Sequence, residues 1–329
     1  MALVASIGQG QAGTCPYCNT TSGSKTLYPT VDMYEQHFMV NQCGECHTVY
    51  LNPPPTDVQL AQAYSEAYYG EQDQKFNSLV ERVVDFFRKQ RAIIISSYVP
   101  QPAKVLDIGC GNGRFLYHML RRGNYEAHGV ELPGKAAERA AQVKGIHLKL
   151  GNLNAADFPT GFFDAVTMFH VIEHLNQPRQ TLQAISQILK PGGIAYISMP
   201  NIDSWQSRLF KGKWLHLDPP RHLFFLSPTH LQSEMKSLGF NLISERYFNP
   251  EYNPFGMQQS MLNLFCSKRE VLFEHLKGNK QYVTGYSPAN LFLQNLFFKT
   301  TFPLFMLYDA VEALFKKSAT VEMVFQKQA

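Results

Sequence analysis

Side chains that can carry protons gather in one short stretch, residues 169–174, which reads Phe-His-Val-Ile-Glu-His. His170 and His174 stand four positions apart with Glu173 between them, so a helical turn here would point all three in one direction. Histidine is the usual general base near neutral pH, and His222, in the run Pro-Pro-Arg-His, is a second candidate for that role. The alternative is that these residues only order a loop or contact a bound ligand.

Cysteines provide a second group of reactive side chains. Two C-x-x-C pairs are formed by Cys15, Cys18, Cys43 and Cys46. Together they can offer four thiolates to one tetrahedral zinc ion, across a spacer slightly longer than the usual zinc-ribbon gap. The spacer contains a predicted hairpin with strands over 25–28 and 37–41. Because His47 follows the second pair, the pattern also fits attachment of a c-type haem, but that attachment requires export. A redox dithiol is another alternative, but it would leave one of the two pairs unexplained. The spacing therefore favours structural zinc.

The composition is that of a globular protein. The chain has 329 residues, of which 45% are hydrophobic, enough for one large domain or two. Its net charge of +4 is too small to argue for nucleic acid as a partner. The first residues lack a basic region and a cleavage pattern, so we expect no signal peptide and a cytoplasmic location.

Strands and helices alternate through most of the chain. Strands are predicted over 103–108, 125–130, 146–150, 163–169, 194–199, 240–248 and 320–326. Helices are predicted over 76–98, over 113–122, from Pro133 onward, over 178–189, and from Ser227-Pro228 to Gly239. The run Pro191-Gly192-Gly193 is expected to end the fourth of these helices. The first of these helices rests on an apolar stripe of Leu79, Val80, Val83, Val84, Phe86 and Phe87. Such alternation predicts an α/β fold with a parallel sheet covered by helices on both faces.

A glycine-rich turn follows the first of these strands. Gly109, Gly111 and Gly113 stand at alternate positions, as a sharp turn with a ligand against its backbone requires. Asp107 stands at the carboxyl end of the strand, where ligands bind in open α/β sheets. The dinucleotide fingerprint G-x-G-x-x-G fails because Arg114 takes its sixth position. The pattern D-x-G-x-G-x-G instead resembles motif I of the class I S-adenosylmethionine (SAM) methyltransferases.

This resemblance implies a fold, a cofactor and a binding site. The fold is a Rossmann-like, doubly wound sheet of seven strands, with the last strand inserted antiparallel beside the sixth. SAM carries a cationic sulfonium, an amine and a ribose, so Asp107 suits the amine and Glu131, which ends the second strand, suits the ribose hydroxyls. Asn152 and Leu153 are expected at the adenine, although many members of the family have an acid where Asn152 stands, and Phe169 is expected to contact the cofactor.

Residues 170–174 also resemble the Glu-x-x-Glu-His metal motif of small-RNA 2′-O-methyltransferases and of ubiquinone-pathway O-methyltransferases. Here His170 replaces the first glutamate, and His222 is the candidate for the later ligand of those families. Imidazole and carboxylate groups suit Zn²⁺, Fe²⁺ or Mn²⁺ better than Mg²⁺. A catalytic metal and a metal-free acid/base role for His174 or His222 both stay open.

The cysteine pairs, the run Val-Tyr-Leu-Asn-Pro-Pro-Pro and the later run Pro-Pro-Arg-His-Leu-Phe-Phe-Leu-Ser resemble a bacterial subgroup of these enzymes. That subgroup is associated with surface-polysaccharide and natural-product pathways, and its N-terminal module is similar to that of sugar C-methyltransferases. We therefore expect methyl transfer to an O or C atom of a small molecule, such as a sugar or a glycan or lipid precursor. Arg221 is expected to position an anionic substrate or to form a surface salt bridge.

Two other functions are open. An RNA methyltransferase could use the zinc module as an RNA grip, but residues 15–60 contain Lys25 alone among lysines and arginines. A non-catalytic subunit could bind SAM only to fold, although the presence of both Asp107 and Glu131 beside residues 170–174 argues against it.

The predicted organisation has five parts. These are a zinc module (1–60), a helical linker with a tyrosine-rich start (61–100), the SAM-binding core (101–248), a hydrophobic helical insertion (249–318) and a final core strand (319–329). Within the insertion, residues 289–316 are rich in Phe and Leu, but Lys299, Pro303 and Asp309 exclude a membrane-spanning helix. The segment can contact a membrane surface or a lipid-linked substrate. The alternative, which the sequence favours, is that it packs on the protein itself or on a second subunit.

Overall fold

The computed structural model describes residues 13–64 and 78–329. The first twelve residues, and Tyr68, Tyr69 and Phe76 of the predicted linker, lie outside the described residues. The strands are β1 (Lys25–Val31), β2 (His37–Gln42), β3 (Val49–Asn52), β4 (Ala103–Ile108), β5 (Tyr125–Glu131), β6 (Ile146–Leu150), β7 (Phe163–Phe169), β8 (Leu189–Pro200), β9 (Phe224–Phe225), β10 (Phe240–Arg246) and β11 (Thr320–Lys327). The α-helices are α1 (Asp57–Ala63), α3 (Ser78–Tyr98), α4 (Arg114–Arg122), α5 (Lys135–Ala141), α6 (Pro178–Ile188), α7 (Trp205–Phe210), α8 (Pro228–Ser237), α9 (Asn253–Phe265), α10 (Val271–Lys277) and α11 (Pro288–Leu314). Short 3₁₀ helices are η1 (Ala155–Asp157), η2 (Ile172–His174), η3 (Lys211–Lys213) and η4 (Leu215–Leu217).

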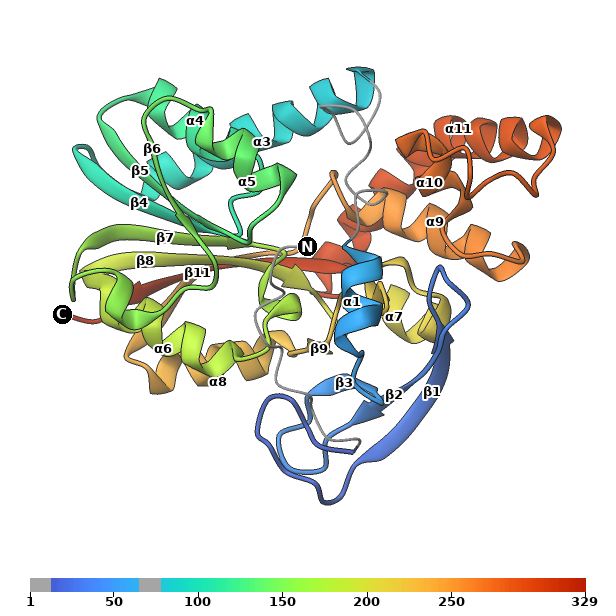
Figure 1. The fold of residues 1–329 in the computed structure, drawn as a ribbon, viewed down its shortest axis with the longest axis horizontal. Helices are drawn as coiled ribbons and strands as arrows, with labels where there is room; N and C mark the ends of the chain where they lie inside the picture. Colours follow the sequence, from blue (N-terminus) through green and yellow to red (C-terminus); the bar gives the residue numbers. More distant parts are fainter. Residues whose placement is uncertain (1–12, 65–77) are drawn as a thin grey trace.

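A seven-stranded sheet forms the centre of the molecule, in the order β10-β11-β8-β7-β4-β5-β6. Strands β4 to β8 are parallel to one another, whereas β11 lies between β10 and β8 and runs antiparallel to both. Helices α3, α4 and α5 cover one face of this sheet, and α6 and α8 cover the other (Figure 1). The predicted fold class, including the antiparallel last strand, is confirmed.

Strand β4 forms at the middle of the sheet because its residues suit burial on both faces. Val105, Leu106 and Ile108 are buried, as expected for a parallel strand with helices on either side. One predicted boundary was wrong. The run Pro191-Gly192-Gly193 lies inside β8, which begins directly after α6 at Leu189. The apolar Leu189 pairs with Phe163 of β7, so sheet pairing begins before the glycines.

A second sheet of four strands, β1-β2-β3-β9, forms the N-terminal module. Strands β1 and β2 make the predicted hairpin, with Thr30 opposite Phe38. The fourth strand was not predicted: β9 comes from the 201–226 segment and pairs antiparallel with β3 through Tyr50 and Phe224. The module is therefore completed by a strand that lies far along the chain.

Helix α3 packs on the sheet through residues near its C-terminal end. Val83 and Phe86 are 50% and 54% exposed, whereas Ala92, Ile95 and Val99 are buried in the core beside the sheet. Small and branched residues near the C-terminal end of α3 therefore make the contact. Phe86 of the predicted stripe does not make this contact.

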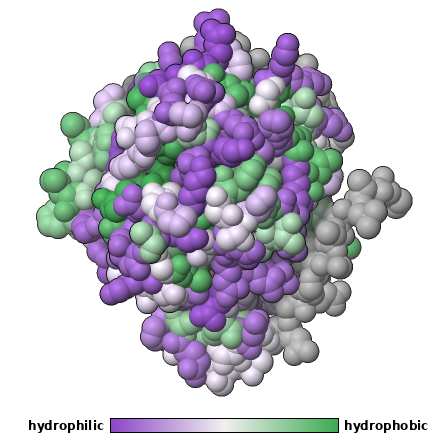
Figure 2. Space-filling model, turned by 90° about the vertical axis from the view of Figure 1, so that its left-hand side faces the viewer, coloured by the Kyte–Doolittle hydropathy of each residue, from purple (hydrophilic) through white to green (hydrophobic). Residues whose placement is uncertain are grey.

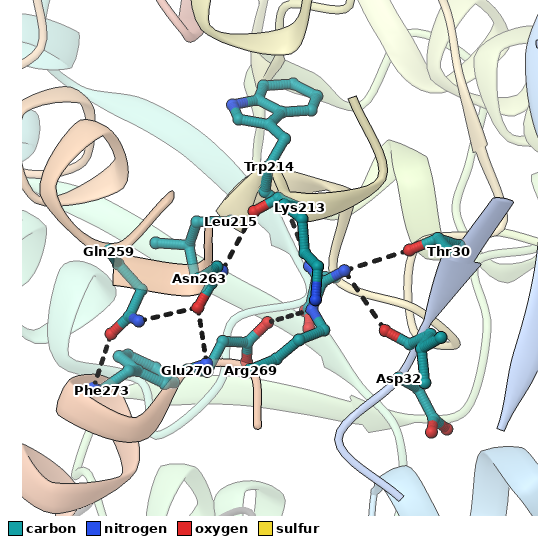
Figure 3. A network of polar contacts seen from close by, with 12 residues as sticks. Thr30, Asp32, Lys213, Trp214, Leu215, Gln259, Asn263, Arg269, Glu270 and Phe273 are labelled. Atoms are coloured by element: carbon teal, nitrogen blue, oxygen red, sulfur yellow. Dashed lines mark hydrogen bonds and ion pairs between the residues drawn. The ribbon is translucent and has the colours of Figure 1, made fainter. Parts of the chain in front are cut away.

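Helices α9, α10 and α11 form an arm at the right of Figure 1. The buried guanidinium of Arg269 ties the base of this arm to the rest of the protein (Figure 3). It donates to the Thr30 hydroxyl at 3.1 Å, to the Val31 carbonyl at 3.3 Å and to the Trp214 carbonyl at 2.9 Å. One side chain thus joins the N-terminal sheet, the 201–226 segment and the arm.

Candidate active site

The glycine turn after β4 lies at the carboxyl edge of the large sheet. Gly109, Gly111 and Gly113 have φ values of 70°, 57° and 72°, a region that favours glycine. A side chain at Gly109 would collide with Val171, so this glycine allows the segment after β7 to pack on the turn. A Cβ at Gly111 would meet nothing within 4 Å, so the turn has open space in front of it.

Two carboxylates flank this turn. Asp107 is buried and accepts a hydrogen bond from the Thr167 hydroxyl at 2.7 Å. Burial raises the pKa of Asp107 to about 7, against the lowering effects of Thr167 and of the charge on Arg91. Glu131 accepts the amide hydrogens of Gly111 and Leu132 at 2.6 and 3.0 Å, one on each oxygen. Each of its oxygens keeps a further lone pair for a ligand hydroxyl.

The other residues predicted to bind the cofactor lie at the same edge. The amide of Gly151 donates to the Glu131 carbonyl at 2.8 Å, which brings the start of the 151–154 segment beside that acid. Asn152 is exposed, and Leu153 is partly buried against the core. Phe169 ends β7, and its ring lies 5.1 Å from Phe115. The structure therefore brings together the ends of four neighbouring strands, where open α/β sheets bind ligands.

Residues 170–174 do not form the helical turn that would point their side chains in one direction. His170 has a φ of 53°, and only η2 follows it. The His170 ring lies 4.5 Å from that of Tyr252, whereas the His174 ring lies 4.6 Å from that of His222. The stretch therefore splits its two histidines between two environments, with Glu173 between them.

Glu173 is a buried carboxylate surrounded by imidazoles. His170 Nδ1 lies 3.3 Å and His222 Nε2 lies 3.9 Å from its Oε1 atom. Burial would raise the pKa of Glu173, but His170, His222 and His174 together lower it to about 2, so it is charged at neutral pH. Among the described residues, neither of its oxygens accepts a hydrogen bond of normal geometry. Such an unsatisfied charge indicates that a proton donor or a cation belongs there.

The proton positions of His174 and His222 follow from their neighbours. His174 Nδ1 lies 2.8 Å from the Arg221 carbonyl, and His222 Nδ1 lies 2.8 Å from the His216 carbonyl. A carbonyl oxygen can only accept, so both Nδ1 atoms carry a hydrogen, and Nε2 is the acceptor of His174 in its neutral form. Burial, followed by the charge of His222, lowers the pKa of His174 to about 4, so His174 is neutral at pH 7.

This arrangement can serve as a base or as a cation site. One ligand atom from each of Glu173, His174 and His222 lies within 4.8 Å of the others. His170 is not part of this group of three. Metal-binding histidines commonly donate their second ring nitrogen to a carbonyl, as His174 and His222 do here.

Several neighbours of the site were not singled out from the sequence. Arg91 of α3 donates to the Tyr252 hydroxyl at 2.8 Å, pairs with Glu251, and lies 5.0 Å from the centre of the Phe169 ring. The hydroxyl of Tyr64 lies 2.9 Å from His174 Nδ1. These contacts join helices and loops far apart in the sequence, so no local pattern marks them.

Arg221 does not fulfil either of its expected roles. It is buried, and its guanidinium forms an ion pair with Asp218 through two nitrogens. It also donates to the Ala63 carbonyl at 3.4 Å. Its bidentate partner is therefore a residue of the same loop, which fixes the Arg221 carbonyl that His174 contacts.

The four cysteines of the N-terminal module meet in one cluster. The Sγ atoms of Cys15 and Cys46, and those of Cys18 and Cys43, lie 3.6 Å apart, and all four lie within 4.8 Å of one another. Four thiolates at ~2.3 Å from a tetrahedral zinc ion would be separated by ~3.8 Å. The geometry is consistent with the predicted zinc site.

The fold and this edge define a class of protein. A seven-stranded sheet with an antiparallel last strand, a glycine turn after β4 and an acid after β5 are the features of a SAM-binding methyltransferase. Residues 76–245, just over half of the chain, match the family model of the methyltransferase domain. The chain belongs to this family, and the protein is a SAM-dependent methyltransferase.

Several relatives and structures are similar to this chain. The ubiquinone biosynthesis O-methyltransferase of Azoarcus sp. is 31% identical over 169 residues, which cover 46% of this chain and 69% of the relative. The enzyme of the same name from Leptothrix cholodnii is 31% identical, with 46% and 68% covered. The structure of phosphoethanolamine N-methyltransferase 2 of Haemonchus contortus with S-adenosyl-L-methionine has a TM-score of 0.51 at 15% identity, covering 93% of this chain and 69% of that one. That similarity shows the fold alone.

The residues at the turn fit SAM. A Cβ at Gly111 would point into open space, so the backbone leaves room for a ligand to lie against it. The nearby charged groups are mainly acidic, as the cationic sulfonium and amine of SAM require, and a phosphate-bearing ligand would be repelled by Asp107 and Glu131.

Proposed function

We propose that the protein transfers the methyl group of SAM to a hydroxyl oxygen of a small molecule. The observation that carries this proposal is the buried, charged Glu173 beside His174, a neutral imidazole whose Nδ1 hydrogen leaves Nε2 as the acceptor. A hydroxyl nucleophile must lose its proton, and this group can accept one. The relatives named above support O-methylation of a small molecule. They give no support to the sugar, glycan or lipid precursor expected from the N-terminal module.

In this proposal SAM lies across the glycine turn. Asp107 faces its amine, Glu131 takes the ribose hydroxyls, and Asn152 and Leu153 lie beside the adenine. Phe169, held between Phe115 and Arg91, walls the methionine end of the cofactor. Transfer then depends on alignment of the acceptor oxygen, the methyl carbon and the sulfur, and orientation of this kind supplies much of the rate.

The acceptor proton passes to Nε2 of His174 or His222. Glu173 lies between the histidines and stabilises the imidazolium that forms, while Nδ1 of His170 lies against the same Oε1 oxygen as His222. The carbonyls of Arg221 and His216 fix the ring orientations beforehand. Removal of the base should therefore lower turnover with little effect on SAM affinity.

A divalent cation is the second candidate for the same site. Glu173, His174 and His222 offer one oxygen and two nitrogens, a donor set that suits Zn²⁺, Fe²⁺ or Mn²⁺. When bound, such an ion would hold the acceptor oxygen and lower the pKa of its hydroxyl. The unsatisfied oxygens of Glu173 favour this candidate as much as a base.

The cysteine cluster is proposed to hold a structural zinc ion. Four thiolates leave no open coordination position for chemistry. The module instead positions the site: the amide of Leu51 in β3 donates to the Leu223 carbonyl at 3.1 Å, and the amide of Leu223 donates to the Glu173 carbonyl at 2.8 Å. These two bonds connect the zinc module to His222 and Glu173.

The test uses catechol as the acceptor, because its acidic, adjacent hydroxyls suit either mechanism. With SAM labelled in the methyl group, we expect label in a methoxy product. His174→Ala or His222→Ala should lower turnover by roughly 10²–10⁴-fold. His147→Ala, which changes an exposed histidine outside the cluster, is the control and should be fully active.

Chelator separates the two candidates. If turnover stops with a chelator treatment that leaves the zinc of the cysteine cluster in place, and returns with Mn²⁺, then Glu173, His174 and His222 bind a catalytic cation. If chelator has no effect, these residues provide the base. Full turnover of both histidine variants in the presence of chelator would reject both roles for the cluster.

A further inference from the structure

Helix α11 presents a continuous apolar stripe to its surroundings. The exposed members of this stripe are Leu293, Leu296, Leu304, Leu307, Val311 and Leu314. They follow one another at helical spacing, with the exposed Thr300 between Leu296 and Leu304. Leu307 is 69% and Leu314 is 82% exposed. The helix has 27 residues and is about 40 Å long, so the stripe is far larger than a chance group of apolar side chains.

The opposite face of α11 packs on the protein through Phe305 and Tyr308 and also buries the polar residues Gln294, Asp309 and Glu312. Asp309 accepts hydrogen bonds from the Asn249 amide at 3.0 Å and from the Asn253 side chain at 2.8 Å. Glu312 accepts one from Gln206 at 2.9 Å. These bonds prevent the helix from rolling to bury its stripe. The helix is therefore held with Asp309 and Glu312 against the protein and its leucine stripe outward.

The apolar surface continues onto α9. Phe265, the last residue of α9, is 85% exposed, and Phe292 at the start of α11 is 65% exposed. Between the two helices lies a cavity of about 310 Å³. Its lining is mainly apolar and consists of Met261, Leu262, Phe265, Asn290, Leu293, Gln294 and Phe297. The arm thus combines a long apolar stripe with an apolar recess.

The charges of the arm have one sign. In residues 253–317, which the structure describes throughout, the exposed charged side chains are those of Lys280, Lys299 and Lys316. The acidic residues of this segment are all buried, namely Glu270, Glu274, Asp309 and Glu312. Lys316 forms an ion pair with Glu245 of β10, so Lys280 and Lys299 give this apolar surface its positive charge, and such a surface matches a partner that is apolar and negatively charged.

We propose that this arm, the surface of α9 and α11 defined by the stripe and its lysines, docks on an anionic lipid bilayer. The leucines enter the boundary between headgroups and acyl chains, and the lysines meet lipid phosphates. The arm lies on the bilayer and does not cross it, since none of the helices within 13–64 and 78–329 has the length and apolar character for a membrane crossing.

Two observations favour a bilayer over a second copy of the chain. A symmetric contact through the stripe would place the lysines of both copies in one interface, and no exposed acid within residues 253–317 could pair with them. The apolar surface is also local. Figure 2, which views the molecule from the side opposite the arm, shows mainly hydrophilic residues across its centre and apolar ones in small groups.

The test is co-sedimentation of the full chain with vesicles. Wild type should bind vesicles of phosphatidylglycerol mixed with phosphatidylcholine, bind phosphatidylcholine alone more weakly, and release as salt is raised. Leu304→Glu combined with Leu307→Glu should lower the bound fraction by at least about tenfold, since both side chains are exposed and must enter the bilayer boundary. The matched control is Val58→Glu with Ile243→Glu, which changes two exposed apolar residues outside the arm and should bind like wild type.

A second variant protects the test against a folding defect. Lys280→Glu with Lys299→Glu leaves the stripe intact and should abolish the preference for phosphatidylglycerol. Vesicle binding is measured without methyl transfer. It can therefore fail while the proposed function holds, and the proposed function can fail while vesicle binding holds. Equal binding of all variants, or no binding of wild type to phosphatidylglycerol vesicles, would overturn the proposal. Wild type could instead form a dimer and not bind vesicles, with the Leu304→Glu, Leu307→Glu variant a monomer. That result would assign the surface to a second copy of the chain.

Discussion

The affinity of the protein for SAM should fall as the pH is lowered through about 7, and Asp107 should be responsible. Burial raises the pKa of Asp107 to about 7, the hydrogen bond from Thr167 and the charge of Arg91 lower it, and the charge of Glu131 raises it. Above this pKa the carboxylate is charged and attracts the cationic amine of SAM. Below it the carboxyl group is neutral and that attraction is lost.

The size of the effect follows from the titration of this one group. With a pKa of about 7, Asp107 is charged in about 76% of molecules at pH 7.5 and in about 9% at pH 6. If only the charged form binds SAM well, the dissociation constant rises about eightfold over this interval, or about 1.2 kcal/mol. The interval must stay below the pKa of the cofactor's own amino group, which is about 7.7–8.0 for an α-amine.

Titration calorimetry between pH 6 and 7.5 measures this dependence. Asp107→Asn should bind SAM weakly at every pH, because its amide never carries the charge. Glu131→Gln should weaken binding and move the slope to lower pH, because the charge of Glu131 raises the pKa of Asp107. A wild-type affinity that is constant over this interval, or an Asp107→Asn variant with the same slope, would refute the reasoning.

Three further predictions concern the turn, the cysteines and the base. Gly111→Arg should abolish calorimetric binding of SAM and of its demethylated product, because the side chain fills the open space at the turn. Elemental analysis should find one zinc ion per chain, and Cys18→Ser should lose it and melt at a lower temperature, because metal binding and folding of the module are coupled. If His174 is the base, turnover at saturating SAM should be level from pH 6 to 8 and fall only near its lowered pKa of about 4, since protonation removes the acceptor Nε2.

Each of these predictions has a result that contradicts it. Unchanged SAM binding by Gly111→Arg would place the cofactor elsewhere. The control for a bulky charge is Gly192→Arg, at an open glycine of positive φ near the amino end of β8. Zinc-free protein with an unaltered melting temperature would reject the structural ion. Turnover could instead depend on pH near 7, with this dependence kept in His222→Ala and lost in His174→Ala. That result would mean that the pKa of His174 lies far above its expected value.

The cofactor edge could be predicted from the sequence because local rules determine it. An apolar run before alternate glycines specifies a buried strand and a tight turn, and the acid after the next strand is placed by the parallel pairing of β4 and β5. Gly111 and Glu131 are therefore neighbours in space although they are separated in the chain.

The catalytic cluster could be predicted only in part. The sequence identified Glu173, His174 and His222, but it suggested a helix that would have included His170 on the same side. The left-handed backbone of His170 depends on how Val171 packs against Gly109, which is a tertiary contact.

Other features have no local signal at all. Strand β9 is two residues long, so it has no periodicity, and its partner β3 lies far earlier in the chain. The orientation of α11 was equally inaccessible, because its Phe-rich and Leu-rich sequence is apolar over much of its circumference. The buried bonds of Asp309 and Glu312, together with the packing of Phe305 and Tyr308 against the core, decide which side faces outward.

The atom that receives the methyl group tests the central claim most directly. The native acceptor can be enriched from an extract of cells that make the protein, by incubation with SAM carrying a ¹³C-labelled methyl group. Nuclear magnetic resonance of the labelled product then identifies the bonded atom. We predict a small-molecule product in which the labelled carbon is a methoxy carbon, formed by wild type and not by the His174→Ala, His222→Ala double variant. Label bonded to carbon or nitrogen, or carried by RNA, would contradict this account.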